Sequence, residues 1–235
     1  VKLNLQKWLE ADKNHVLAKL SHALLSLYEG DSAEFDRLNK SSFRDHHLMR
    51  SARWLLTLPK LPTLIMHRYP FFNAMIESSI KSRPFYEFGV WRAHSFKYLM
   101  RSFEKGYGFD TFTGLPEAWH GEKAASYSND GIIPRVHGGE FIVGKFEETL
   151  PKFFSKSRPL ASLINFDADL YSSTLCALNH ARRVIDEETI LIFDEFFMHD
   201  TWEQDEFRAL HEFCNATGFR YQVQAVSVYS KQVAV

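Results

Sequence analysis

The chain has 235 residues, of which 45% are hydrophobic and 24% are charged, and its formal net charge is −1. These proportions are typical of a globular domain, and the near-neutral charge argues against binding to nucleic acid or to an acidic membrane surface. The sequence has no apolar run long enough for a membrane span, and its two cysteines, Cys176 and Cys214, lie far apart. We therefore expect a cytoplasmic protein.

Residues 1–80 are predicted to form a cap of several short helices. Leu20, Leu24 and Leu27 recur at helical spacing, and Gly30 follows as a helix terminator. Two interpretations stay open for this cap. In the first, the cap packs on the following domain. In the second, it is a docking surface for a partner, and that partner can be another copy of the chain in a homo-oligomer.

From residue 81 onward, short apolar runs alternate with helical stretches. Alternation of this kind predicts an α/β fold with a doubly wound, mostly parallel sheet that is covered by helices on both faces. The last two strands have no helix between them and are expected to form a hairpin. The predicted strands are residues 85–89, 107–110, 140–143, 162–167, 189–194, 220–226 and 232–235.

Acidic side chains lie at or near the ends of four of these strands. They are Glu87, Asp110, Asp167 and Asp194, and Gly89 closes the first strand. The carboxyl ends of parallel strands form one edge of a sheet, and that edge binds ligands in such folds. A buried carboxylate is costly unless it is paired or binds a metal. We therefore expect these acids to share one site.

The segment around Gly89 has features of a cofactor-binding turn. Gly89 allows a tight turn and a close approach of the backbone to a ligand, and Ser95 lies near the start of the next helix, where a carboxylate is favoured. Ser95 as a simple helix cap is the alternative. Asp110 follows Gly89 by 21 residues, the spacing of the acid that binds a ribose in nucleotide-binding folds. Because no GxGxxG motif is present, a nucleoside without pyrophosphate fits better than NAD.

Three acids at adjacent strand ends predict a site for a divalent cation. Asp167, Asp194 and Glu195 offer the hard oxygen ligands that suit Mg²⁺, and a cation there would lower the pKa of a substrate oxygen. We interpret Asp169 as the N-cap of the following helix. Four histidines in loops near this edge are candidates for a general base: His94, His120, His137 and His199.

Five segments taken in order resemble the macrocin O-methyltransferase family of class I, S-adenosylmethionine-dependent enzymes. The resemblance covers residues 84–235 and implies a class I methyltransferase domain, over residues 81–235, with a Rossmann-like seven-stranded sheet that ends in an antiparallel strand. It also implies methyl transfer to the hydroxyl of a sugar or natural-product-like small molecule. The segments are residues 87–92 with Ser95, 108–116, 146–151, 167–174 and 193–196.

The resemblance assigns roles to individual residues. It implies that Glu87, Gly89 and Ser95 lie along the methionine moiety of S-adenosylmethionine, that Asp110 binds the ribose, and that Phe146 contacts the adenine. It further implies that Asp167, Asp194 and Glu195 hold a metal, usually magnesium.

Three positions depart from the family pattern. Ala93 replaces a common glycine, Glu195 replaces an aspartate, and Leu170 replaces a histidine that some members carry. The general base therefore stays open between Asp167 itself, a loop histidine, and a metal-bound hydroxyl without a separate base. The alternative function is a catalytically silent methyltransferase-like module whose helical N-terminus docks a partner.

The chain contains 21 phenylalanines, and several flank the strand-end acids. We expect these to line a cleft of low dielectric constant as well as to fill the core: Phe88, Phe109, Phe112, Phe146, Phe166, Phe193 and Phe196. The glycine-containing loop from about residue 119 to 139 is expected to form a lid.

Overall fold

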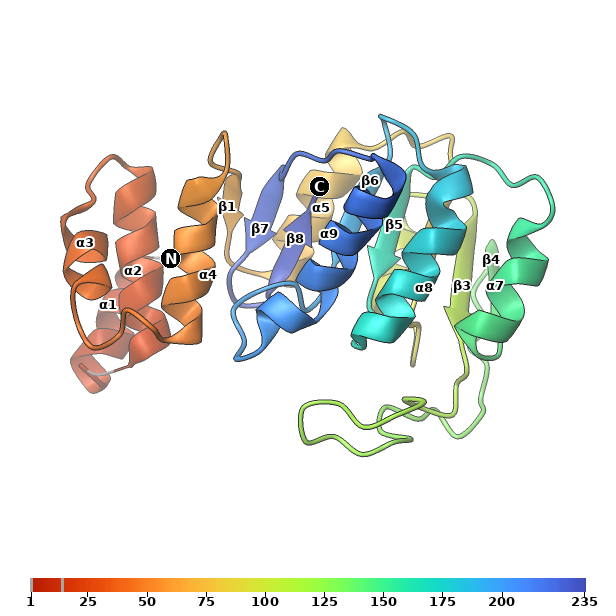
Figure 1. The fold of residues 1–235 in the computed structure, drawn as a ribbon, viewed down its shortest axis with the longest axis horizontal. Coiled ribbons are helices and arrows are strands. Elements are labelled where there is room, and N and C mark those ends of the chain that lie inside the picture. The colour runs from red at the N-terminus through yellow and green to blue at the C-terminus, as the bar shows by residue number, and fades with distance from the viewer. Residues whose placement is uncertain (1, 14) are drawn as a thin grey trace.

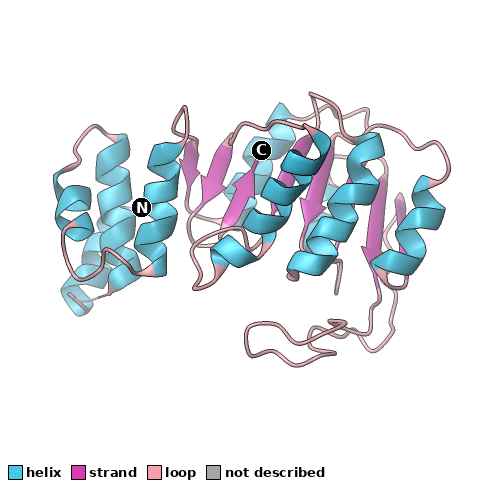
Figure 2. Ribbon diagram, in the orientation of Figure 1, coloured by secondary structure: helices cyan, strands magenta, loops and turns pink. Residues whose placement is uncertain are grey.

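The computed structural model describes residues 2–13 and 15–235. After the first four helices, strands alternate with helices except at two places, where one strand follows another without a helix between them (Figure 2). The helices are α1 (Lys2–Ala11), α2 (Val16–Tyr28), α3 (Ala33–Asn39), α4 (His47–Thr57), α5 (Arg68–Ser78), α6 (His94–Leu99), α7 (Phe146–Phe154), α8 (Tyr171–Ala181) and α9 (Glu206–Thr217). The strands are β1 (Thr63–Ile65), β2 (Phe85–Phe88), β3 (Gly106–Asp110), β4 (Gly139–Val143), β5 (Leu163–Phe166), β6 (Ile190–Phe193), β7 (Ala225–Ser227) and β8 (Gln232–Ala234).

All of these strands belong to one sheet with the order β1-β7-β8-β6-β5-β2-β3-β4. Every pairing is parallel except those of β8, which runs antiparallel to both β6 and β7. The predicted α/β class, parallel sheet and closing hairpin are confirmed. The order of the chain reverses at β2, which lies between β3 and β5, and a reversal of this kind is where doubly wound sheets bind ligands.

The inner strands β2, β5 and β6 are buried on both faces because their side chains alternate between two apolar layers. On one face Phe88, Phe109, Phe166 and Phe193 stack across four neighbouring strands, with ring centroids 4.7 to 5.3 Å apart. This layer packs under α7, α8 and α9, which lie in front of the sheet in Figure 1. The opposite layer packs against α5 and α6.

The sheet has eight strands rather than the predicted seven. The additional strand, β1, pairs in parallel with β7 at the edge of the sheet. Residues 63–65 therefore form a strand, whereas the sequence predicts helices throughout residues 1–80. Helix α5 also packs on the sheet through Phe71 and Phe72. The division into a helical cap (residues 1–80) and a methyltransferase-like domain (residues 81–235) stays a prediction, and this packing favours a boundary near residue 60.

Helices α1 to α4 lie beside the β1 edge of the sheet (Figure 1). Trp54 of α4 joins them to the rest of the chain, since its ring centroid lies 5.6 to 6.0 Å from those of Phe196, Phe197, Trp202 and Phe207. Within residues 2–13 and 15–235, every helix is too short or too polar to cross a bilayer.

Candidate functional site

A cavity of about 460 Å³ opens at the carboxyl ends of the parallel strands. It gathers seven of the eight residues predicted to bind the cofactor or the metal. Its walls include Gly89, Ser95, Asp110, Phe146, Asp167, Asp194 and Glu195. The physical reason is the parallel sheet itself, because residues that follow neighbouring parallel strands meet at one edge.

Glu87, the eighth predicted residue, lies directly behind the cavity wall. Its side chain is completely buried, and its Oε1 accepts hydrogen bonds from the Ser95 hydroxyl and, at 3.2 Å, from the Asn165 amide. Its Oε2 is buried without a protein partner. Burial raises the pKa of Glu87 to about 8, although both hydrogen bonds oppose the shift. A buried carboxyl oxygen without a partner beside a cavity fits a cationic ligand group.

Gly89 and Asp110 together shape the turn after β2. Gly89 has φ +89°, and a Cβ atom there would lie 1.7 Å from the Asp167 carbonyl oxygen. The Asp110 Oδ2 accepts hydrogen bonds from the Val90 and Trp91 amides, both at 2.7 Å, and its Oδ1 accepts one from Phe112 at 2.6 Å. A carboxylate has about four acceptor positions, so one is left for a ligand hydroxyl.

Two of the three predicted metal ligands already have protein partners of opposite charge. Asp194 Oδ2 accepts a hydrogen bond from Arg68 at 2.9 Å, and its Oδ1 accepts one from the Gln232 amide at 2.7 Å. Glu195 Oε2 is paired with Lys231 at 2.9 Å. Arg68 was not predicted from the sequence, where an arginine beginning a helix has no distinguishing signal.

Negative charge remains in excess despite these pairs. Burial and the charges of Asp194 and Asp169 raise the pKa of Asp167 well above its usual range. Burial also raises the pKa of Asp194, and the charge of Arg68 opposes that shift. The oxygen atoms of three carboxylates, with negative charge still uncompensated, are suitable ligands for a hard divalent cation. Arg68 already supplies one positive charge to the Asp194 carboxylate, so it would compete with such an ion.

Asp169 is a wall residue and not the helix cap that we expected. Leu170 is the N-cap residue of α8, without a side-chain cap, and Asp169 has φ +60° and lines the cavity. Burial and the neighbouring charges of Asp194 and Glu195 raise the pKa of Asp169 to about 7. The sequence position directly before a helix made the capping interpretation attractive, but the left-handed backbone turns the residue into the cavity instead.

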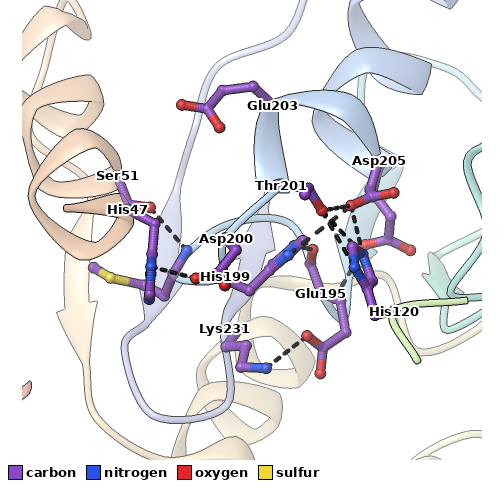
Figure 3. Close-up of polar contacts among 12 residues, drawn as sticks. His47, Ser51, His120, Glu195, His199, Asp200, Thr201, Glu203, Asp205 and Lys231 are labelled. Atoms are coloured by element: carbon purple, nitrogen blue, oxygen red, sulfur yellow. Dashed lines mark hydrogen bonds and ion pairs between the residues drawn. The ribbon is translucent and has the colours of Figure 1, made fainter. Parts of the chain in front are cut away.

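The candidate histidines are separated in the structure. His94 lines the cavity, whereas His137 is exposed and does not line it. His120 and His199 lie together beside the cavity, next to Asp205 (Figure 3).

A further buried acid, Glu206, supports this edge, since its Oε2 accepts a hydrogen bond from the Glu195 amide at 3.1 Å. The sequence does not single out Glu206, because acidic residues are common in the first turn of a helix.

The expectation that phenylalanines line the cleft is wrong for most of them. Only Phe146 of the named set lines the cavity. The other six are completely buried: Phe88, Phe109, Phe112, Phe166, Phe193 and Phe196. Strand residues alternate between faces, so neighbours of a strand-end acid point into the core layers.

Among solved structures the chain resembles methyltransferases. A calicheamicin methyltransferase, CalS11, superimposes with a TM-score of 0.52 and 16% identity over 92% of this chain and 91% of that chain. The chain has the fold of a methyltransferase. An apo structure of CalS11, described as a TDP-rhamnose 3′-O-methyltransferase, gives a TM-score of 0.51 at 17% identity over 92% of each chain. The O-methyltransferase NovP gives 0.50 at 15% identity, over 70% of this chain and 77% of that chain. No protein-family model and no curated protein matches the sequence.

Proposed function

We propose that this protein is an S-adenosylmethionine-dependent O-methyltransferase that acts on a hydroxyl of a small molecule, of sugar or natural-product type. The observation that carries the proposal is the single cavity into which the strand-end residues converge. The fold supports it, since CalS11 and NovP are both described as methyltransferases. The bound cofactor would supply the electrophilic methyl group.

The chain's own residues would bind and orient the cofactor. Glu87 would accept the positive charge of its amino group, because the buried Oε2 has no protein partner. Asp110 would use its remaining acceptor position for a ribose hydroxyl, and Phe146, at the start of α7, would pack on the adenine. Orientation of two reacting groups in a cavity that excludes water is a large part of catalysis in such a transfer.

Asp167, Asp194 and Glu195 would hold a divalent cation such as Mg²⁺. When bound there, the cation supplies positive charge that lowers the pKa of an acceptor hydroxyl. Asp167 is the first candidate for the catalytic group that contacts the acceptor. We further propose that the enzyme is cytoplasmic.

The charge of the cavity indicates the class of acceptor. Six acidic side chains line it, against one arginine and one lysine. A wall of this sign attracts the cationic cofactor and disfavours an anionic acceptor. We therefore infer that an uncharged glycoside or polyol is methylated in preference to a nucleotide sugar.

Calorimetry with S-adenosylhomocysteine tests cofactor binding, and a saturable 1:1 isotherm is expected. Turnover is then measured on neutral glycosides and nucleotide sugars, with Mg²⁺ or with EDTA. Asp167→Asn should reduce turnover by at least about 100-fold, since removing one group that acts in the transition state has an effect of this size. Asp45→Asn, at an exposed site in the turn between α3 and α4, is the matched control. Absence of cofactor binding would refute the proposal. Full activity in EDTA would refute the part of the proposal that assigns a metal to the site.

A second candidate is a cofactor-binding module without turnover. One observation favours it: Arg68 and Lys231 already pair with two of the three predicted metal ligands. Saturable cofactor binding combined with no methyl transfer to any acceptor, at any Mg²⁺ concentration, would select this candidate.

A further inference from the structure

Three metal-ligating side chains converge beside the cavity without forming part of its wall. They are His120, His199 and Asp205, and one ligand atom of each lies within 4.8 Å of the other two (Figure 3). Asp205 Oδ2 lies 3.0 Å from His120 Nε2 and 3.9 Å from His199 Nδ1. In a tetrahedral site with bonds of about 2.1 Å, ligand atoms are roughly 3.4 Å apart. Small rotations of the side chains would therefore complete the site.

The hydrogen bonds around His199 and Asp205 orient both groups as ligands. His199 Nε2 donates to the Glu195 carbonyl oxygen at 2.8 Å, so this nitrogen carries the hydrogen, and Nδ1 of the neutral ring faces Asp205 with its lone pair. A cation between these two acceptors, which lie 3.9 Å apart, would bind both lone pairs and remove their mutual repulsion. Asp205 is also held by the Thr201 hydroxyl, which donates to its Oδ2 at 2.9 Å. Partners of this kind are typical of the outer shell of metal sites.

The segment that carries His199 and Asp205 is anchored from its other side by α4. The Met198 amide donates to the Ser51 hydroxyl at 2.9 Å. Arg50 donates to Glu203 at 2.8 Å and to the Asp200 carbonyl oxygen at 2.9 Å. Figure 3 shows Ser51 and His47 reaching this segment from the helix. Two of the three ligands are therefore positioned before any ion binds.

The third ligand comes from the long loop between β3 and β4. His120 has φ +44°, a left-handed conformation that is unfavourable for a residue with a Cβ atom and is found at functional sites. Its neighbour Trp119 lines the cavity and packs on the His120 ring, with centroids 4.7 Å apart. An ion at His120 would therefore fix the part of the loop that forms the cavity wall.

We propose that His120, His199 and Asp205 bind Zn²⁺, and that the ion fastens the β3–β4 loop across the cavity to the segment after β6. Two imidazoles and one carboxylate favour zinc over magnesium, which prefers oxygen ligands. The neutral His120 ring would move its hydrogen from Nε2 to Nδ1 and offer the freed nitrogen to the ion. The site uses none of the acids at the strand ends.

Calorimetric titration with Zn²⁺, in a buffer that contains millimolar Mg²⁺, tests the site without any cofactor. One saturable site is expected. The His120→Ala and His199→Ala variants should bind at least about 100-fold more weakly, because even the loss of an outer-shell partner costs 10- to 100-fold. His137→Ala, an exposed histidine of the same loop, and Asp167→Asn should bind like the parent protein. Absence of saturable binding, or equal affinity in the His120 and His199 variants, would overturn the proposal.

Limited trypsin digestion tests the consequence for the loop. Cleavage at the exposed Lys123 should slow by at least about fivefold when Zn²⁺ is added to the parent protein, because only an opened loop is cut. The His120→Ala variant should show no such protection, and its side chain lies on an exposed loop, so the fold is not at risk. Equal protection in both proteins would refute the fastening role. Neither experiment depends on methyl transfer.

Discussion

Replacing Glu87 with glutamine should separate the stability of the free protein from its affinity for the cofactor. The glutamine side chain has the same shape and can still accept hydrogen bonds from Ser95 and Asn165, but it cannot be charged. Glu87 has a pKa of about 8 instead of 4.5. At about 1.4 kcal/mol per pKa unit, the buried carboxylate destabilises the fold by about 5 kcal/mol once it is fully ionised.

The pH dependence follows from the direction of this shift. Between pH 4.5 and 8 the folded chain binds more protons at Glu87 than the unfolded chain does, so this acid lowers the stability as the pH rises. The stability gained by Glu87→Gln should therefore increase by about 3 kcal/mol between pH 5.5 and 8.5. Urea unfolding at the two pH values measures it. Glu140→Gln, on the exposed side of edge strand β4, is the control. A gain that is the same at both pH values would refute the reasoning.

The same substitution should weaken binding of S-adenosylhomocysteine by about 10- to 100-fold, the value of a charged hydrogen bond. In the parent protein at pH 7, a pKa of about 8 leaves Glu87 protonated in roughly nine of ten molecules. Binding of a cationic amino group requires the carboxylate, so about 0.9 proton should be released per cofactor. Calorimetry in buffers of different ionisation enthalpy measures this release. Release of the same number of protons by Glu87→Gln would show that another group is responsible.

Two further substitutions test the geometry of the site. Gly89→Ala should abolish cofactor binding and destabilise the fold by more than about 3 kcal/mol in urea unfolding, because its Cβ would overlap the Asp167 carbonyl oxygen. Gly30 has φ +96°, and no atom lies within 4 Å of a Cβ placed there. Gly30→Ala should therefore lower the free energy of unfolding by only about 1 kcal/mol. Equal losses for the two substitutions would contradict the overlap at Gly89. Arg68→Met should tighten Mg²⁺ binding by at least about tenfold, because it removes the positive charge that competes for Asp194. Calorimetry measures the affinity, and the remote substitution Lys105→Met is the control. Unchanged or weaker binding would show that Arg68 does not compete.

The strand-end pattern shows how far local sequence reaches. Strands β2, β3, β5 and β6 are recognisable because each is an apolar run followed by an acid or a glycine. β1 was not recognised, since Thr63–Ile65 is three residues long and lies between segments of helical character. The interpretation of Asp169 as a cap failed for a different reason. Capping depends on the backbone dihedral angles of one residue, and an aspartate before a helix suits both the extended conformation of a cap and the left-handed φ of +60° that Asp169 adopts.

The sequence by itself determined the class of fold and the edge of the sheet where the acids meet, because parallel strands all end at the same edge. Only the tertiary structure decided which groups those acids face. Arg68 lies 126 residues from Asp194 in the chain, and His120 lies 85 residues from Asp205. Periodicity reports which face of an element is buried, but pairing between distant side chains depends on how the elements pack. The competition at the strand ends and the proposed zinc site therefore appear only in the folded chain.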